Sequence, residues 1–161
     1  MLVKAEHNAA RWGVGFNGLV QEISKLDVPA DSFDLVWLSA SMYSTVPTSK
    51  RRIDMLRRIG NALGSGGYLV CQFHWDETHQ NSPLAESFRK AIAFLTSGYF
   101  DYEQGDQLWG NVEFIHSFSD PNRLKAEFES GGFELIHIHI SKKNLSGGAV
   151  LKPRTFSRQP I

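Results

Sequence analysis

LDVPADSFDLVWLS, residues 26–39, is the stretch of sequence that decides the fold. Its first half is rich in turn-forming residues, and its second half, Phe33 to Ser39, is a nearly continuous apolar run. A run of this kind is typical of a strand that helices cover on both faces. A second apolar run, Tyr68 to Phe73, follows the Gly66-Gly67 turn. These two runs predict two central strands.

Helical patterns lie on either side of the first predicted strand. Residues Leu2 to Trp12 are rich in helix-forming residues and stop at Gly13, after which Val14 to Val20 forms a short extended run. From Thr48 to Leu63 the apolar residues recur at helical spacing. Four arginines lie between these apolar positions, and we interpret them as a solvated helix face: Arg51, Arg52, Arg57 and Arg58.

The second half of the chain adds further helices and a hairpin. Ser82-Pro83 and Asp120-Pro121 each supply a cap and a first-turn proline for a helix. Thr96 to Phe118 mixes aromatic residues with Gly, Asp and Asn without a clear period, which predicts a long loop or lid. Phe133 to Ile140 and Gly148 to Pro153 are predicted to form a strand hairpin. The alternation of strands and helices predicts an α/β fold.

The bulk composition limits the possible partners and the location. Seventeen basic residues balance seventeen acidic ones, so the chain has no overall positive field to attract nucleic acid or an anionic membrane. No apolar stretch approaches the length that a membrane helix needs. The one cysteine, Cys71, lies within an apolar run and is interpreted as a buried thiol rather than a nucleophile. We expect neither nucleic acid nor membrane as a partner, and a cytoplasmic location.

Residues 26–39 and the later segment NALGSGGYLV, residues 61–70, together resemble the middle of the class I S-adenosylmethionine-dependent methyltransferase family. Gly64 to Gly67 replaces the family's usual Lys-Pro-Gly-Gly, and Phe133 resembles the start of its sixth strand. The likeness covers residues 1–155 as a partial methyltransferase domain and leaves 156–161 as a tail. It implies a Rossmann-like sheet, mostly parallel with an antiparallel C-terminal hairpin, and methyl transfer from S-adenosylmethionine to a small-molecule acceptor.

The resemblance also implies where the cofactor lies. In an open parallel sheet, ligands bind beyond the carboxyl ends of the strands. Glu22 falls where the family has a polar side chain near the adenine amino group, with Ile23 beside the ring. Ser39, Ala40 and Met42 belong to the loop that passes the sulfonium. The alternative is that Glu22 is an exposed loop residue and that Met42 only packs over the sheet edge.

Two residues near this predicted crevice are candidates for catalysis. Tyr43, in the same loop, is placed to orient a heteroatom of the acceptor, or it packs over the sheet edge. His74 follows the second central strand and is placed to accept a proton as the methyl group moves, although a surface histidine is the alternative. His116, just before the late helix, is a weaker candidate for the same role.

One literal motif is discounted. GVGFNG, Gly13 to Gly18, matches the Gly-x-Gly-x-x-Gly of nucleotide-binding loops, but it follows a helix instead of a strand and does not open a helix. A nicotinamide-dependent enzyme that uses it is therefore a third hypothesis, which requires nucleotide binding through Gly15.

The family's Gly-rich cofactor loop and its first strands are expected before residue 1. Without them we expect weak cofactor binding, or none, unless a partner chain supplies that half. The Phe33 to Ser39 strand then has an open edge, which favours homo-oligomerisation. The alternative function is a non-catalytic, methyltransferase-like interaction module.

Overall fold

The computed structural model describes residues 2–39, 42–78, 103–109 and 113–154. Their elements follow one another as α1 (Leu2–Trp12), η1 (Ile23–Lys25), β1 (Phe33–Leu38), α2 (Ser49–Ala62), β2 (Leu63–Trp75), β3 (Asp106–Trp109), β4 (Glu113–Phe118), α4 (Pro121–Ser130), β5 (Phe133–Ser141) and β6 (Ser146–Pro153). None of the helices in these ranges is long and apolar enough to cross a membrane.

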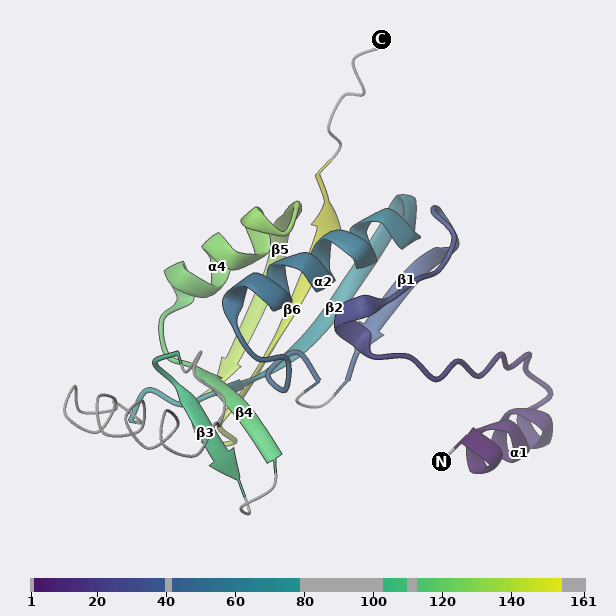
Figure 1. Ribbon diagram of the computed structural model, residues 1–161, viewed down its shortest axis with the longest axis horizontal. Helices are drawn as coiled ribbons and strands as arrows, with labels where there is room; N and C mark the ends of the chain where they lie inside the picture. Colours follow the sequence, from purple (N-terminus) through teal and green to yellow (C-terminus); the bar gives the residue numbers. More distant parts are fainter. Residues whose placement is uncertain (1, 40–41, 79–102, 110–112, 155–161) are drawn as a thin grey trace, which may run out of the picture.

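The strands form a sheet around the long central strand β2 (Figure 1). β1 pairs with β2 in parallel, with Leu35 opposite Tyr68 and Leu38 opposite Cys71. On the same side, β4 pairs in parallel with the last residues of β2. β6 pairs antiparallel with β2 on its other side, and β5 pairs antiparallel with β6. The predicted parallel, side-by-side arrangement of the two apolar runs is confirmed.

The sheet is mixed, so the predicted mostly parallel sheet is not confirmed. β1, β2, β4 and β5 run in one direction, whereas β6 and β3 run in the other. The reason is that β6 lies between β2 and β5, and that β3 forms a hairpin with β4. The predicted antiparallel hairpin at the C-terminal end is confirmed as β5 and β6.

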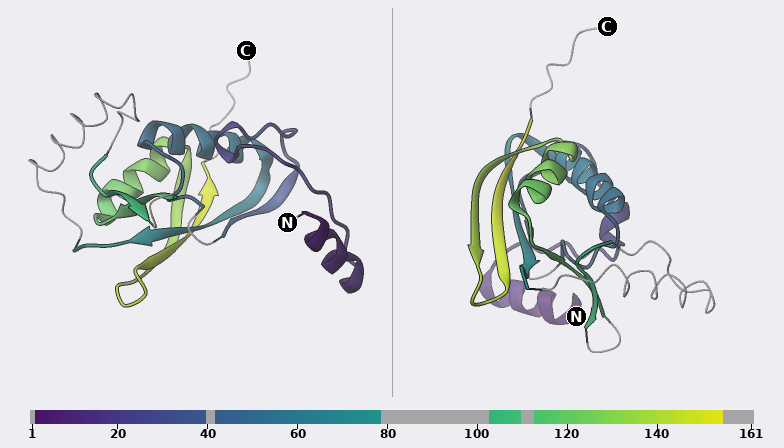
Figure 2. Two further views of the ribbon diagram at one scale, coloured as in Figure 1. Left: turned by 60° about the horizontal axis from the view of Figure 1, so that its bottom comes forward. Right: turned by 90° about the vertical axis from the view of Figure 1, so that its left-hand side faces the viewer.

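Helices α2 and α4 cover one face of the sheet (Figure 2). The cap of α2 is Thr48, whose side chain accepts from Arg51 N, and the cap of α4 is Asp120, which accepts from Asn122 N. The side chains that fill the space between these helices and the sheet are almost fully buried: Met55, Leu56, Ile59, Leu69, Cys71, Phe73, Trp75, Leu124, Phe128 and Leu151. Each large apolar side chain buried there contributes roughly 1.5–3 kcal/mol.

The structure corrects three of the predicted elements. Residues 14–20, predicted as a short extended run, are not part of the sheet, and no described strand pairs with them. The described part of the predicted loop from Thr96 to Phe118 contains the β3–β4 hairpin. Among the four arginines predicted to be solvated, Arg52 is fully buried in ion pairs. The predicted helix that begins at Ser82 lies outside the described residues.

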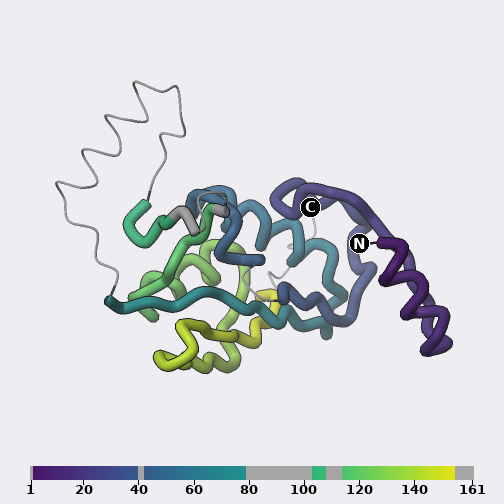
Figure 3. Tube along the Cα trace, turned by 90° about the horizontal axis from the view of Figure 1, so that it is seen from below, coloured from purple at the N-terminus to yellow at the C-terminus, as the bar shows by residue number. Residues whose placement is uncertain are grey.

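The opposite face of the sheet remains uncovered near β1. Leu35 and Trp37 are 57% and 63% exposed, and Tyr68 on the neighbouring strand is 40% exposed. The outer edge of β1 has no strand partner within the described ranges. Helix α1 lies beyond this edge and apart from α2 and α4 (Figures 1 and 3). An apolar surface that includes a strand edge is therefore open to solvent.

Candidate functional site

The carboxyl ends of β1 and β2 lie at one edge of the sheet because the two strands are parallel. The loop after β1 is fastened to the end of β2, since His74 N donates to Ser44 Oγ at 2.8 Å. The same loop is fastened to β4, since His116 N donates to Ser44 O at 2.8 Å. Ser44 therefore holds the loop after β1 against both the end of β2 and the β3–β4 hairpin. The loop after β1 and the end of β2 are the segments where the sequence predicted the site.

His74 is half-buried at the end of β2 and contacts the hairpin. Its Nδ1 lies 2.9 Å from Ser117 Oγ, which also accepts from Gln107 Nε2 at 2.9 Å. Burial lowers the pKa of His74 because it disfavours the charged imidazole, while the nearby Asp76 carboxylate opposes this shift. A neutral imidazole is the form that accepts a proton, so the position is compatible with the predicted base role, which stays a prediction.

Tyr43 lies in the core rather than in an open crevice. Its side chain is fully buried, and its hydroxyl donates to Glu127 Oε1 at 2.5 Å. The ring stacks on Phe118, with 5.6 Å between the ring centroids. Burial and the adjacent carboxylate raise the pKa of Tyr43, so the hydroxyl keeps its proton. The predicted role of orienting an acceptor stays a prediction, and this geometry favours the alternative of packing.

A buried charged network that the sequence analysis missed lies beside Tyr43. Arg52 Nε donates to Glu127 Oε1 at 2.7 Å, and Arg52 Nη2 donates to Glu103 Oε2 at 2.8 Å. Burial opposes the charge on Arg52, but its bonds to Glu127 outweigh this and raise its pKa. The signal was present, because Arg52 precedes the buried Met55 and Leu56 by three and four positions and therefore shares their helix face.

Glu103 continues this network into the hairpin. Its Oε1 accepts from Ser49 N at 2.7 Å, and its own N donates to Asp106 Oδ2 at 2.6 Å. Asp106 Oδ1 lies 2.6 Å from His116 Nδ1. Ligand atoms of Glu103, Asp106 and His116 lie within 4.8 Å of one another, as in a metal site. Because the oxygens of Glu103 and Asp106 already accept from Arg52, Ser49 N and Glu103 N, and Asp106 also pairs with His116, we interpret the cluster as a hydrogen-bond network that holds the hairpin on α2 and α4.

The predicted cofactor residues lie in two separate places. Ser39 and Met42 are exposed in the loop after β1, and Ala40 lies outside the described residues. Glu22 and Ile23 lie at η1, which packs against α2. Among the described residues, no hydrogen bond or ion pair joins η1 to the loop after β1. The predicted set is therefore not brought together into a single contact network.

The carboxylate of Glu22 is exposed and engaged locally. It accepts from Ser24 Oγ at 2.5 Å and lies 2.7 Å from Lys25 Nζ. The bonds to Lys25 and Ser24 lower the pKa of Glu22, so it is charged at neutral pH. A charged carboxylate accepts hydrogen bonds from an exocyclic amine, which keeps both the predicted adenine contact and the surface alternative open.

The comparisons with known proteins give the fold. No family model matches the chain. No curated protein sequence matches it either. Solved structures do match: an S-adenosylmethionine-dependent methyltransferase from Clostridium acetobutylicum superimposes with a TM-score of 0.66 at 13% identity, over 94% of this chain and 70% of that one. The chain has the class I methyltransferase fold.

Two further structures share the methyltransferase fold. One is a methyltransferase from Methanosarcina mazei, with a TM-score of 0.59 at 17% identity over 84% of this chain and 66% of that one. The other is 1,6-didemethyltoxoflavin-N1-methyltransferase from Burkholderia thailandensis, solved with that substrate and S-adenosylhomocysteine bound. Its TM-score is 0.62 at 13% identity, over 92% of this chain and 55% of that one. The chain thus spans between 55% and 70% of these proteins.

Gly13 to Gly18 does not form a nucleotide-binding loop in this methyltransferase fold. The motif follows α1 and opens no helix, as expected from its context. Gly13 has a φ of +64° and ends α1, and a Cβ added at Gly13 or Gly15 would meet no heavy atom within 4 Å. The backbone at Gly13 and Gly15 therefore shows no cradle that requires glycine for close approach.

Proposed function

We propose that the chain takes part in S-adenosylmethionine-dependent methyl transfer to a small-molecule acceptor. The observation that carries this proposal is the sheet around β2, in which β1 and β2 present their carboxyl ends together and which superimposes on a methyltransferase that was solved with S-adenosylhomocysteine. Ligand sites of open α/β sheets lie beyond such ends. S-adenosylmethionine, when bound, supplies a methyl group activated on a sulfonium.

The residues that we propose for the cofactor fit it in part. Ser39 contributes a hydroxyl and Met42 an exposed thioether side chain at the carboxyl end of β1. Glu22 offers a charged carboxylate for an amine, and Ile23 an apolar contact. Ala40, between Ser39 and Met42 in the sequence, is proposed on the resemblance alone. These residues supply polar and apolar contacts but no chain of backbone amides, so we expect this chain to bind the cofactor weakly.

For the transfer step we propose that His74 accepts the proton of the acceptor. The lowered pKa keeps its imidazole neutral, and Ser117 orients the ring through Nδ1. Tyr43 is proposed to act from a distance, because its buried bond to Glu127 fixes the loop that carries Ser39 and Met42. Alignment of this kind is the main task of the protein in a methyl transfer.

Ligand-observed saturation-transfer NMR with S-adenosylhomocysteine tests this proposal. We expect weak binding that is lost in Ser39→Leu and in Met42→Lys, because both changes alter the loop after β1. Glu134→Gln is the control. Glu134 lies at the amino end of β5, away from the carboxyl ends of β1 and β2, so this variant should keep binding. Absence of any signal with the unaltered chain at millimolar ligand would overturn cofactor binding by this chain on its own.

One observation favours a second candidate, a non-catalytic interaction module. Leu35, Trp37 and Tyr68 form an exposed apolar surface beside the open edge of β1. Exposed apolar patches next to an unpaired strand are typical of association surfaces. We propose that homo-oligomers form through this edge.

We also propose a cytoplasmic location. The thiol of Cys71 is buried, and burial raises its pKa, which fits a protein that works in a reducing compartment.

A further inference from the structure

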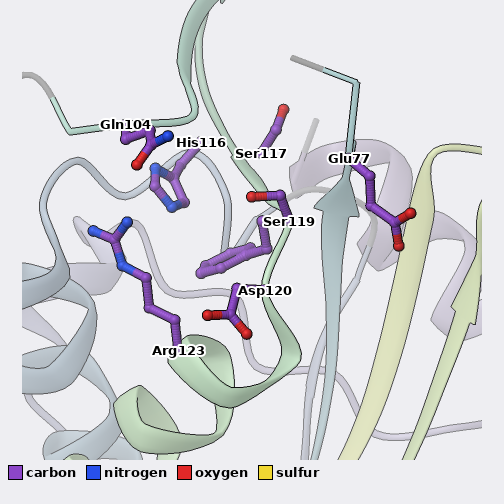
Figure 4. Close-up of a pocket in the computed structure, with 8 residues that line it drawn as sticks. Glu77, Gln104, His116, Ser117, Ser119, Asp120 and Arg123 are labelled. Carbon is purple, nitrogen blue, oxygen red and sulfur yellow. The ribbon is translucent and has the colours of Figure 1, made fainter. Parts of the chain in front are cut away.

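A polar pocket of about 480 Å³ opens next to the proposed site (Figure 4). It lies between the end of β2, the end of β4 and the first turn of α4. Gln104, Ser117, Ser119 and Arg123 contribute to its lining, with His116 at its inner wall. Ser117 connects it to the proposed site, because its Oγ contacts His74 Nδ1.

The orientation of His116 in this pocket is fixed by Asp106. The two side chains are 3% and 1% exposed, and His116 Nδ1 lies 2.6 Å from Asp106 Oδ1. A carboxylate only accepts hydrogen bonds, so Nδ1 carries the proton. In the neutral ring, Nε2 is then the acceptor. Asp106 is itself held by Glu103 N at 2.6 Å from its other oxygen.

Nε2 of His116 lacks a hydrogen-bond partner within the described part of the chain. Figure 4 shows the ring projecting into the pocket, with one nitrogen directed toward the space that Arg123 and Asp120 border. Buried polar atoms are almost always paired with protein, water or ligand. The unpaired acceptor therefore points to a ligand that brings a donor.

The charges around the pocket define the rest of this ligand. Two carboxylates line it, but both have partners: Glu77 pairs with Lys142 at 2.7 Å, and Asp120 caps α4. Arg123 has no carboxylate within ion-pair distance among the described residues, and it lies at the helix N-terminus, whose dipole also favours anions. The pocket thus offers an acceptor at His116 and a positive region at Arg123.

We propose that this pocket binds the methyl acceptor, a small hydroxy acid, with its hydroxyl on His116 Nε2 and its acid group at Arg123. This inference rests on the proposed function and replaces the general small-molecule acceptor with a defined chemical class. For an acceptor bound in this way, His116 takes the place of His74 as the group that accepts the hydroxyl proton, and Asp106 is its positioning residue.

The step balances without any further reagent. S-adenosylmethionine, when bound, would supply the methyl carbon for the new bond to the acceptor oxygen, and the electron pair of its broken carbon–sulfur bond would stay on its sulfur. The hydroxyl proton moves to His116 Nε2. The Asp106 carboxylate stabilises the resulting imidazolium, as an aspartate does in other Asp–His pairs, until the proton leaves to water.

The first test is binding of a probe, 4-hydroxybenzoate, with benzoate as the matched compound that lacks the hydroxyl. Saturation-transfer NMR should show that the chain binds 4-hydroxybenzoate more tightly than benzoate. His116→Gln should weaken only the hydroxybenzoate, and Arg123→Gln should weaken both, each by about tenfold or more. Glu134→Gln, at the amino end of β5 and away from this pocket, should leave binding of both probes unchanged. Thermal unfolding of each variant verifies that it is folded.

The second test uses Asp106→Asn, which keeps the histidine. Glu103 N requires the amide oxygen of the new side chain, so the amide NH₂ faces His116 Nδ1 and shifts the ring proton to Nε2. In alkaline buffer, ¹⁵N-histidine NMR should show an unprotonated Nε2 of His116 in the unaltered chain and a protonated one in the variant. A purely structural role for Asp106 would not predict this exchange.

The outcomes separate this inference from the proposed function. Equal binding of the two probes, or binding of 4-hydroxybenzoate that His116→Gln leaves unchanged, overturns the acceptor pocket. A protonated Nε2 in the unaltered chain overturns it as well. Binding of S-adenosylhomocysteine, measured in the same samples, tests the proposed function alone: its absence beside intact hydroxybenzoate binding overturns methyl transfer by this chain on its own and retains the hydroxy-acid site.

Discussion

At the scale of single residues, Arg52 shows how a charge becomes part of a core. It is fully buried between α2, α4 and the start of the hairpin, and it also donates to Val46 O at 3.2 Å. Its guanidinium lies 5.3 Å from the centroid of the Phe118 ring. Removal of one partner from a buried ion pair leaves the other charge without compensation. Arg52 therefore joins the elements that carry the site.

The first prediction concerns this residue. Arg52→Met should lower the free energy of unfolding by roughly 3–5 kcal/mol, because Glu127 loses its buried partner. Arg57→Met is the matched control on the same helix. Arg57 is 60% exposed in its side chain, and its loss should change stability by less than about 1 kcal/mol. Urea unfolding followed by circular dichroism measures both. Equal effects in the two variants would contradict the buried network.

The second prediction uses the pH dependence of Glu103. Burial raises its pKa, but bonds from Ser49 N and Arg52 outweigh this and hold it below the ordinary value. A carboxyl with a lowered folded pKa contributes stability that is present above its unfolded pKa, about 4.3, and is lost as the pH falls through the folded value. Glu103→Gln should therefore be less stable at pH 7 but lose less stability below pH 5. Parallel acid titrations of both chains would show identical slopes if Glu103 had no such role.

Part of the site follows from residue patterns, and part does not. His74 was placed correctly at the end of a strand because a strand is a local pattern. The bond of Tyr43 to Glu127 joins residues 84 positions apart, and no local pattern encodes it. The pairing of Asp106 with His116 was hidden for a related reason, since it requires a hairpin whose sequence has no clear alternation.

At the scale of elements, close packing between β2 and β6 depends on one glycine. A Cβ at Gly147 would lie 2.3 Å from Phe73 Cε2, whereas a Cβ at the adjacent Gly148 would meet only Cys71 O at 3.9 Å. Phe73 lies in the core, where neighbouring rings leave little room for it to move. A methyl group therefore fits at Gly148 but collides with Phe73 at Gly147.

The third prediction follows from this difference. Gly147→Ala should lower the free energy of unfolding by about 1–3 kcal/mol through overpacking against Phe73. Gly148→Ala adds the same methyl group on the other face of β6 and should change stability by no more than about 0.5 kcal/mol. Thermal unfolding of the two variants compares them directly. A more stable Gly147→Ala would show that Phe73 has free space beside it.

The predicted elements succeeded where patterns were periodic and flanked by caps. α4 begins at its predicted cap, α2 begins where the helical spacing predicted it, and β5 and β6 form the predicted hairpin. The β3–β4 hairpin was missed because its strands are short and its stability comes from β2, Ser44 and the Arg52 network. The sequence predicted an extended run over Val14 to Val20, but none of the described strands pairs with this segment.

At the scale of the whole molecule, the two faces of the sheet differ in what covers them. α2 and α4 cover one face (Figure 2). The other face exposes large apolar side chains around β1. The sequence predicted strands covered on both sides, because Phe33 to Ser39 is apolar at nearly every position. The exposed residues are therefore suited to burial, and association of two copies is one route to it.

The fourth prediction tests that route. Trp37→Thr combined with Leu35→Thr removes most of the apolar surface beside the open edge while keeping strand-forming residues. Sedimentation velocity should show concentration-dependent association of the unaltered chain, and the double variant should sediment as a monomer. Ile136→Thr is the control on β5, the strand at the opposite edge, where Ile136 is 51% exposed. If this control becomes monomeric and the β1 variant does not, association uses the other edge, and the open edge of β1 is not the surface that joins two copies.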